Sequence, residues 1–224
     1  MNRRILILGD RRLVEEYSAA CTAKGFDVVE TGEADLALEL SNCSREQKRS
    51  NLQMLERTLS PSAVLLSSSV TVTRTEQATW ISDPSRLVGM SAFPTLLAGS
   101  LIEFCDAQEL SHQARKAAED FAATLGKSAV FVRDAIGMVM PRILCMLVNE
   151  AYFAMGENVA ESREIDTAMK LGTNYPRGPV EWAQAAGLDQ VVAVLKALHS
   201  HYGEDRYRCA PMLSMAAFRR HAEG

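Results

Sequence analysis

The first 133 residues alternate short apolar runs with longer stretches that carry apolar residues at helical spacing. Short runs rich in leucine or β-branched residues are typical of buried strands, and the helical spacing indicates amphipathic helices. Strands are expected at residues 5–8, 26–29, 36–40, 63–66, 87–90, 101–105 and 129–132. Helices are expected at residues 13–24, 45–59 and 111–125. This alternation predicts an α/β domain with a largely parallel sheet.

The alternation stops near Arg133 and Asp134. Residues 135–160 have helical periodicity but are apolar nearly all round, which is typical of the central helix of an all-helical unit. Ser162 is expected to cap a helix that ends at residue 171, and further helices are expected at residues 180–186, 190–201 and 211–221. The sequence therefore predicts two domains, residues 1–133 and residues 134–224.

Composition and charge exclude several classes of protein. The net charge of −4 and the absence of a basic stripe with stacking aromatics argue against a nucleic-acid groove. The first apolar run is too short for a signal peptide or a bilayer span, so we expect a cytoplasmic protein without membrane association. The five cysteines form no C-x-x-C pair and no cluster with histidine, so we expect reduced thiols and no metal site.

Several segments of the chain resemble sequence motifs of a known protein family. They are "SPSAVLLSSS", "SRLVGM", "LIEF", "LGKSAVFVRDAIGMVMPRIL" and "NEAYFAMGENVAESREIDTAMKLGTNYPRGPVEWAQAAGLD". In these phrases the chain resembles the 3-hydroxyacyl-CoA dehydrogenases over nearly its whole length. The resemblance implies a Rossmann-like, NAD-binding domain followed by an all-helical domain that forms a homodimer, with an acyl-CoA as ligand. The Gly- and Pro-rich stretch at residues 172–179 is expected to form the turn that sets two helices at a fixed angle.

The first turn departs from the dinucleotide-binding pattern G-x-G-x-x-G. Gly9 matches the first glycine, but Arg11 and Val14 occupy the other two positions, and Asp10 adds a charge that repels phosphate. The resemblance implies that NAD would contact Gly9 and Lys48, and Arg11 is a further candidate because its charge could attract a phosphate. Cys43 stands where the family has a glutamate that faces the cofactor.

The second strand lacks the acidic residue that should bind the ribose of NAD. Gly32 stands at that position, with Glu30 and Glu33 nearby. The chain then runs almost directly into its third strand, where members of the family insert a long helical segment. We therefore expect a shortened Rossmann-like domain.

The residues expected to act on the substrate are also altered. In "GMSAFPT", Ser91 replaces the family's general acid–base histidine, and a serine cannot exchange a proton near neutral pH as imidazole does. Glu103 matches the glutamate that orients this histidine. Ser67 and Ser68 remain in the loop that would hold substrate, but Val70 replaces its functional serine. Pro94 and Pro141 replace two asparagines.

Two hypotheses follow from these departures. The first is a relative that has lost the family's catalysis and acts as a binder of acyl-CoA or nucleotide, or as a partner subunit. The second is a working NAD-dependent oxidoreductase acting on a 3-hydroxyacyl-CoA or a small 3-hydroxy acid. In that case Ser91 would polarise the carbonyl through a water held by Glu103, while Lys48 and Arg11 hold phosphates. A different reaction with Glu103 as base, such as a lyase reaction, also stays open.

Overall fold

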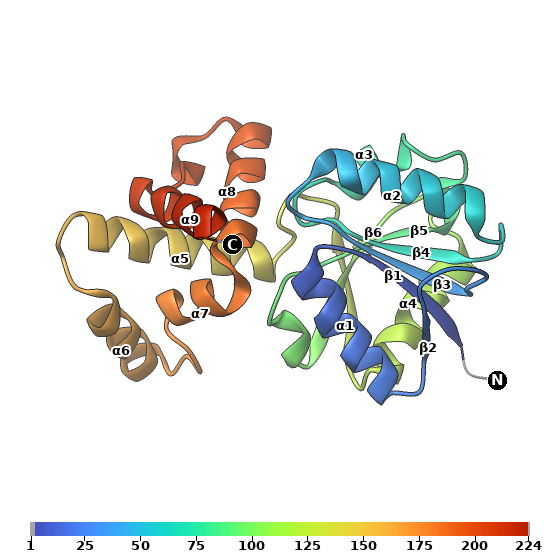
Figure 1. The fold of residues 1–224 in the computed structure, drawn as a ribbon, viewed down its shortest axis with the longest axis horizontal. Coiled ribbons are helices and arrows are strands. Elements are labelled where there is room, and N and C mark those ends of the chain that lie inside the picture. Colours follow the sequence, from blue (N-terminus) through green and yellow to red (C-terminus); the bar gives the residue numbers. More distant parts are fainter. Residues whose placement is uncertain (1–2, 224) are drawn as a thin grey trace. The chain divides into compact units, whose positions relative to one another are not determined.

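A computed structural model describes residues 3–223 of the chain (Figure 1). The chain divides into two compact units, Met1–Val139 and Met140–Gly224. The predicted boundary lies after Arg133, a few residues earlier. Residues 134–139 belong to the first unit because the Gly137 N–H donates to the Val70 carbonyl at 2.8 Å and the Val139 N–H donates to the Glu103 carboxylate at 2.9 Å.

The described part of the first unit contains a seven-stranded sheet in the order β2-β1-β3-β4-β5-β6-β7. The strands are β1 (Arg4–Gly9), β2 (Asp27–Val29), β3 (Leu36–Leu40), β4 (Val64–Ser68), β5 (Leu87–Met90), β6 (Leu101–Asp106) and β7 (Ser128–Arg133). Strands β1 to β5 are parallel, and β6 and β7 run in the opposite direction. The Rossmann-like, largely parallel sheet predicted from the sequence is therefore confirmed.

Helices cover both faces of this sheet (Figure 1). Helices α1 (Arg11–Ala23) and α4 (His112–Thr124) lie on one face, and α2 (Arg45–Thr58) and α3 (Arg74–Ala78) lie on the other. Alternate residues of a strand pack into two different hydrophobic cores, one on each face of the sheet. Ile5 and Ile7 pack on the side of α1 and α4, whereas Leu6 packs on the side of α2. Two short 3₁₀-helices, η1 (Pro84–Arg86) and η2 (Leu96–Ala98), complete the unit.

Helix α3 was not predicted from the sequence. It has only five residues, too few for a periodic pattern, and part of its N-terminal capping comes from far along the chain. The Asp134 carboxylate accepts hydrogen bonds from the N–H groups of Arg74 and Thr75 at 2.9 and 2.7 Å. A distant carboxylate therefore satisfies donors that the helix leaves open at its start.

The connection between β2 and β3 is unusually short. Both strands are parallel to β1 and lie on opposite sides of it, and parallel strands normally need a crossover of a dozen residues or more. Here β2 ends where Val29 pairs with Leu6, and β3 begins where Leu36 pairs with Ile5. Because β2 ends at the level where β3 begins, residues 30–35 can connect the two strands without crossing the length of the sheet. The shortening expected from the sequence thus takes the form of a truncated second strand.

The second unit is helical. It contains α5 (Met140–Gly156), α6 (Ser162–Thr173), α7 (Pro179–Ala186), α8 (Leu188–Tyr202), the 3₁₀-helix η3 (Asp205–Tyr207) and α9 (Pro211–Glu223). Helix α5 begins later than its apolar pattern suggests because Gly137 and Met138 have positive φ angles of 77° and 48°. The cap of α6 is Glu161, in a capping box with Glu164, and not the predicted Ser162. None of the described helices is long and apolar enough to cross a bilayer.

Candidate active site at the carboxyl edge of the sheet

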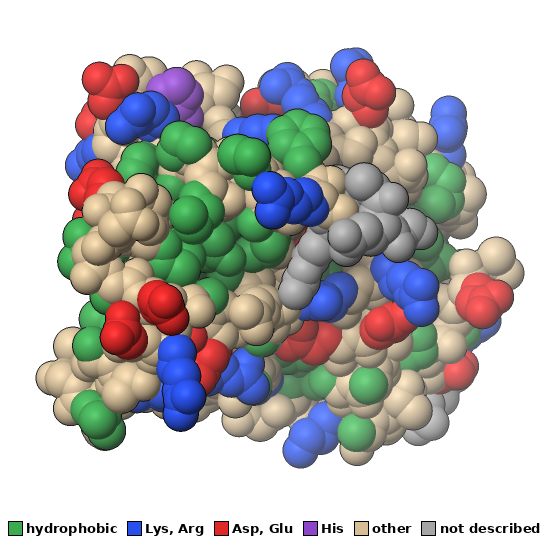
Figure 2. Space-filling view, turned by 60° about the vertical axis from the view of Figure 1, so that its left-hand side comes forward, with side chains coloured by type: hydrophobic (Ala, Val, Ile, Leu, Met, Phe, Trp, Pro, Cys, Tyr) green, Lys and Arg blue, Asp and Glu red, His purple; other side chains and the backbone are tan. Residues whose placement is uncertain are grey.

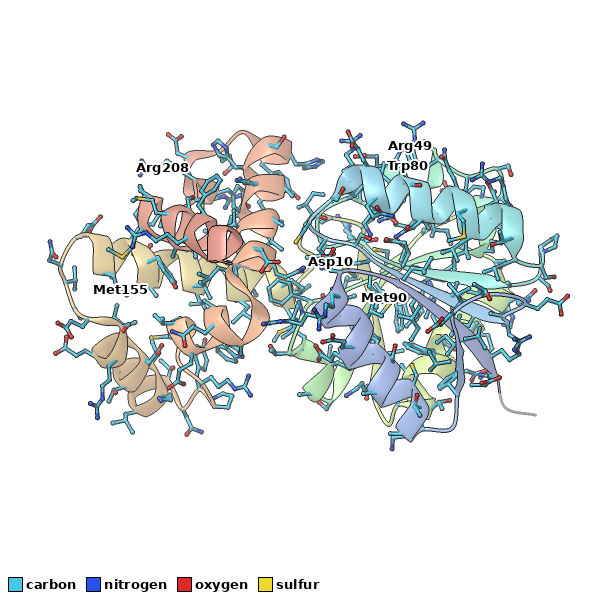
Figure 3. The ribbon with its side chains drawn as sticks, in the orientation of Figure 1. Asp10, Arg49, Trp80, Met90, Met155 and Arg208 are labelled. Carbon is cyan, nitrogen blue, oxygen red and sulfur yellow. The ribbon has the colours of Figure 1, made fainter. Side chains whose placement is uncertain are left out.

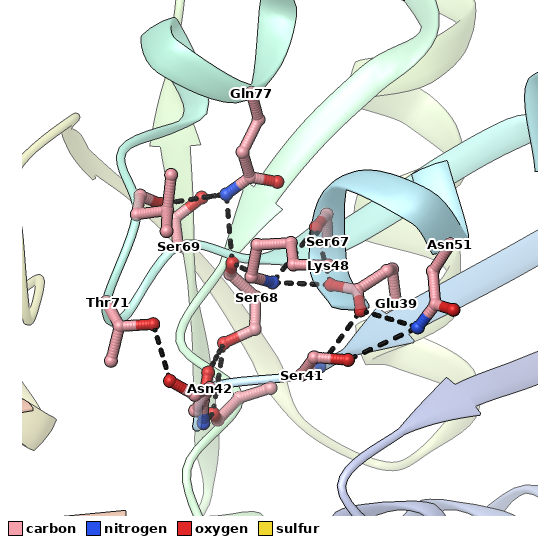
Figure 4. Close-up of polar contacts among 12 residues, drawn as sticks. Glu39, Ser41, Asn42, Lys48, Asn51, Ser67, Ser68, Ser69, Thr71 and Gln77 are labelled. Carbon is pink, nitrogen blue, oxygen red and sulfur yellow. Dashed lines mark hydrogen bonds and ion pairs between the residues drawn. The ribbon is translucent and has the colours of Figure 1, made fainter. Parts of the chain in front are cut away.

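Polar side chains gather where β3 and β4 end, and nearly all of them are buried (Figure 4). In doubly wound folds this carboxyl edge is where ligands bind. The buried members are Glu39, Ser41, Asn42, Lys48, Asn51, Ser67, Ser68, Ser69 and Gln77. A dense polar cluster in such a place requires that its members satisfy one another, because an unpaired buried polar group is costly.

Lys48 is at the centre of this cluster and is completely buried. Its ammonium group forms an ion pair with the Glu39 carboxylate, and it donates to the Ser68 carbonyl at 2.9 Å. Asn51 donates to the other carboxylate oxygen of Glu39 at 3.1 Å. The sequence predicted that Lys48 contacts a cofactor. In this structure its donors are directed into the protein, and helix α2 holds it there.

The two serines predicted to bind substrate lie in the same buried cluster. The Ser67 hydroxyl donates to Glu39 at 3.2 Å, and the Ser68 hydroxyl donates to the Asn42 side chain at 2.6 Å. Both serines are completely buried. Their hydroxyls therefore join the ends of β3 and β4 to each other.

Ser91 and Glu103 lie side by side, because Met90 of β5 pairs with Phe104 of the antiparallel strand β6, which places Ser91 opposite Glu103. The Ser91 N–H donates to the Glu103 carbonyl at 2.9 Å, and the Glu103 N–H donates to the Ser91 hydroxyl at 3.3 Å. Glu103 is 3% exposed, and its carboxylate accepts a hydrogen bond from the Val139 N–H. Main-chain bonds thus fix both residues at this edge.

The turn after β1 brings the chain against itself. Gly9 has a φ of 135°, and a Cβ there would lie 2.7 Å from the Leu40 Cα, so only glycine fits between the ends of β1 and β3. Arg11 starts α1, is 92% exposed along its side chain, and pairs with Glu15 at 2.8 Å. Of the two predicted cofactor residues of this turn, Gly9 is therefore packed against β3 and Arg11 is exposed to solvent.

Asp10 forms contacts that sequence reasoning did not find. Its carboxylate accepts hydrogen bonds from the N–H groups of Asn42 and Cys43 at 2.8 and 3.2 Å, which ties the turn after β1 to the residues after β3. Figure 3 marks Asp10 beside the start of α1. Glu39 is a second residue that sequence reasoning missed. The sequence could have indicated its role, because a glutamate inside the apolar run "LALEL" is expected to be buried and then needs a polar partner.

Two further expectations concern cysteine and metal. Burial, with the neighbouring Asp134 carboxylate, raises the pKa of the Cys105 thiol far above its usual range, so the thiol stays protonated. Cys105 is therefore a packing residue. Over residues 3–223, no group of three or more acidic, histidine or cysteine side chains is arranged to hold a metal ion.

Comparison with known proteins identifies the family. The family model described as "3-hydroxyacyl-CoA dehydrogenase, NAD binding domain" matches residues 14–135, and the model of the C-terminal domain matches residues 137–223. The first match begins after β1 and the turn that holds Gly9, Asp10 and Arg11.

Curated relatives agree with the family models. A "probable 3-hydroxybutyryl-CoA dehydrogenase" of Bacillus subtilis is 32% identical over 82% of this chain and 64% of its own length. The 3-hydroxyadipyl-CoA dehydrogenase of Escherichia coli is 36% identical over 54% of this chain and 26% of its own length. The chain thus spans less than two thirds of the length of the first of these relatives.

Solved structures support the same fold. The (S)-3-hydroxybutyryl-CoA dehydrogenase of Ralstonia eutropha aligns with a TM-score of 0.80 and 24% identity, covering 96% of this chain and 93% of that one. The family models together cover both units of the chain, in the same order as the observed sheet and helices. The chain therefore belongs to the 3-hydroxyacyl-CoA dehydrogenase family.

Proposed function

We propose that this member of the family does not carry out NAD-dependent dehydrogenation and acts as a non-catalytic partner subunit. The observation that carries the proposal is the truncated second strand. In a Rossmann fold the dinucleotide lies across the carboxyl edge of the sheet, and an acidic residue at the end of the second strand binds its ribose.

The acidic residues that follow β2 lie near the opposite edge. Because β2 ends beside Leu6, residues 30–35 remain near the amino ends of the strands. Glu33 lines a hollow of about 900 Å³ together with Arg4, Leu36 and Val64, which stand at or near the starts of β1, β3 and β4. Glu33 is thus at the wrong end of the sheet to meet the ribose of a dinucleotide.

The altered catalytic positions support the same proposal. Unit 1 has a single histidine, His112, and it lines the hollow at the amino edge. A placed general acid–base contributes roughly 10² to 10⁴ to a rate. Ser91, which stands at the family's histidine position, cannot supply it, and Lys48, Ser67 and Ser68 are already engaged with Glu39, Asn42 and main-chain groups.

The helical unit supports a role in assembly, with a second copy of the chain as the proposed partner. Met212, Met215 and Phe218 are 43%, 56% and 70% exposed and recur every three residues along α9. Met212 and Met215 line an apolar groove of about 580 Å³ beside α5. Figure 2, in which this unit comes forward, shows hydrophobic side chains gathered on one face. Apolar surface of this kind marks protein interfaces.

A turnover assay tests the loss of catalysis. The purified protein is mixed with NADH and a 3-oxoacyl-CoA, the reaction partner of 3-hydroxybutyryl-CoA dehydrogenases, and NADH loss is followed by absorbance. We expect the rate of the protein-free control. A rate above that control which Glu103→Gln abolishes would overturn the proposal, and acyl-CoA binding is measured in parallel by calorimetry.

The alternative function, a working oxidoreductase, rests on one observation. Ser91 and Glu103 remain side by side at the carboxyl edge, held by one main-chain hydrogen bond and by one from the Glu103 N–H to the Ser91 hydroxyl. In that case Glu103→Gln removes turnover while Glu33→Gln, at the other edge of the sheet, leaves it unchanged.

A further inference from the structure

The carboxyl ends of β1 and β3 form the crevice in which a doubly wound fold places a ligand. The chain connects from β1 to one side of the sheet through β2 and to the other side through β3, so the strand order reverses here. The start of a helix beside such a crevice favours anions, because its N–H groups point outward. In this protein α1 begins at Arg11, directly after Asp10.

The carboxylate of Asp10 already occupies donors of this crevice. It accepts hydrogen bonds from two successive N–H groups, those of Asn42 and Cys43, immediately after β3. Charge-assisted bonds of this kind are strong and hold the carboxylate in place. The negative charge is thus fixed beside the start of α1, where the pyrophosphate of a dinucleotide would lie.

We propose that Asp10 is a specificity-determining residue that excludes dinucleotides, because its own carboxylate occupies the place and the N–H donors that a pyrophosphate would use. The inference rests on the proposed function and names one residue that prevents NAD from binding. Asp10 is half-buried, and a phosphate placed beside its fixed carboxylate would meet a like charge at short range, which is repulsive.

The family comparison gives independent support. The NAD-binding model matches this chain only from residue 14 onward, so β1, the turn with Asp10 and the first residues of α1 fall outside the match. Gly9 remains, but it is required by the close approach of Leu40 and needs no cofactor to explain it.

Calorimetric titration with NADH tests the proposal on the full chain. Asp10→Ser removes the charge and leaves a small hydroxyl, and Asp10→Asn keeps the size and one acceptor oxygen should the serine protein fail to fold. Asp27→Asn is the matched control, since it removes one charge from unit 1 at β2, where Asp27 pairs with Arg4. Circular dichroism confirms that each variant is folded.

We expect no heat from the unchanged protein or from Asp27→Asn up to millimolar NADH, and at least tenfold tighter binding by a folded Asp10 variant. Micromolar binding by the unchanged protein would overturn the proposal. Folded Asp10 variants that still bind nothing would also overturn it, while leaving the loss of catalysis, which the turnover assay tests separately, untouched.

Thiol alkylation gives a readout that does not depend on activity. Cys43 is exposed and its N–H bonds Asp10, whereas Cys21, Cys105 and Cys145 are buried. NADH should slow alkylation of Cys43 in Asp10→Ser and leave its rate unchanged in the native sequence. Equal protection in both proteins would contradict the assignment.

Discussion

At the scale of the residue, two glycines of the helical unit show how differently the same residue type can act. The stretch at residues 172–179 was expected to fix the angle between two helices. A Cβ at Gly178 would overlap the Asp166 carboxylate, which accepts hydrogen bonds from the N–H groups of Val180 and Glu181 at 2.8 and 3.1 Å. A Cβ at Gly172 would meet nothing within 4 Å. Only Gly178 is therefore required by packing.

Gly178→Ala should lower the free energy of unfolding by about 1–3 kcal/mol, because the added methyl group displaces Asp166 from the start of α7. Gly172→Ala is the matched control. It lies inside α6 and should raise stability by up to about 1 kcal/mol, because alanine favours helix. Urea unfolding of the two variants measures both effects. Equal stability of the two would contradict the assigned role of Gly178.

Glu16 gives the first unit a pH-dependent contact. Burial raises the pKa of its carboxyl group, although the N–H groups of Thr95 and Leu97 stabilise the ionised form. Thr95 itself has a φ of 74°, so the loop after β5 is held in an uncommon conformation at this contact. A raised pKa means that the folded state binds the proton more tightly than the unfolded state does.

The contribution of this proton is therefore fully present below the ordinary pKa of glutamate and is lost as pH rises through the raised value. Glu16→Gln, which keeps an acceptor for the Thr95 N–H, removes this dependence. We expect the stability of Glu16→Gln relative to the native sequence to increase from about pH 4 to neutrality. Unfolding curves at several pH values measure the difference, and a constant difference would contradict it.

At the scale of the element, the Glu39–Lys48 pair joins α2 to the end of β3. Lys48→Met should lower the free energy of unfolding by about 3–5 kcal/mol, because it leaves the buried Glu39 carboxylate without its counter-charge. The double variant Glu39→Gln/Lys48→Met should lose less than the single one, since no charge is stranded. Lys116→Met, which breaks an exposed pair with Asp120 on α4, should change stability little.

Chemical unfolding of these three variants decides the role of Lys48. A small effect of Lys48→Met would indicate that the ammonium group is available to a ligand, as the sequence suggested.

The elements were largely predictable from the sequence, and their contacts were not. Each strand is a short apolar run between turn residues, so periodicity alone located β3 and β5 at their observed bounds. The resemblance to the family predicted that Lys48, Ser67 and Ser68 belong to one ligand site. It could not show that they bond to Glu39 and Asn42, because those partners are chosen by the packing of α2 against β3 and β4. Asp10 was noted for its charge, but its two amide partners lie 32 and 33 positions away.

At the scale of the whole molecule, the property to measure is whether two copies of the chain form a dimer in solution. If the helical unit joins two copies, the native protein should have the mass of a dimer in solution. Phe218→Glu with Met215→Glu should shift it to the monomer, because charges on a buried apolar face are costly. Val130→Lys on β7, also an exposed apolar position but in the other unit, should leave the dimer intact. Size-exclusion chromatography with light scattering measures all three, and a monomeric native protein would contradict the assembly role.

The short link between β2 and β3 also bears on how the first unit folds. Strands β2 and β3 each pair with β1, one on either side, and all three come from residues 4–40. Closing a loop costs entropy that grows with its length, and chains rich in local contacts fold faster. These three strands can therefore nucleate the sheet at low entropic cost, with the later strands extending it toward β7. The connection that keeps the second strand away from the ligand edge thus gives the chain a compact folding nucleus.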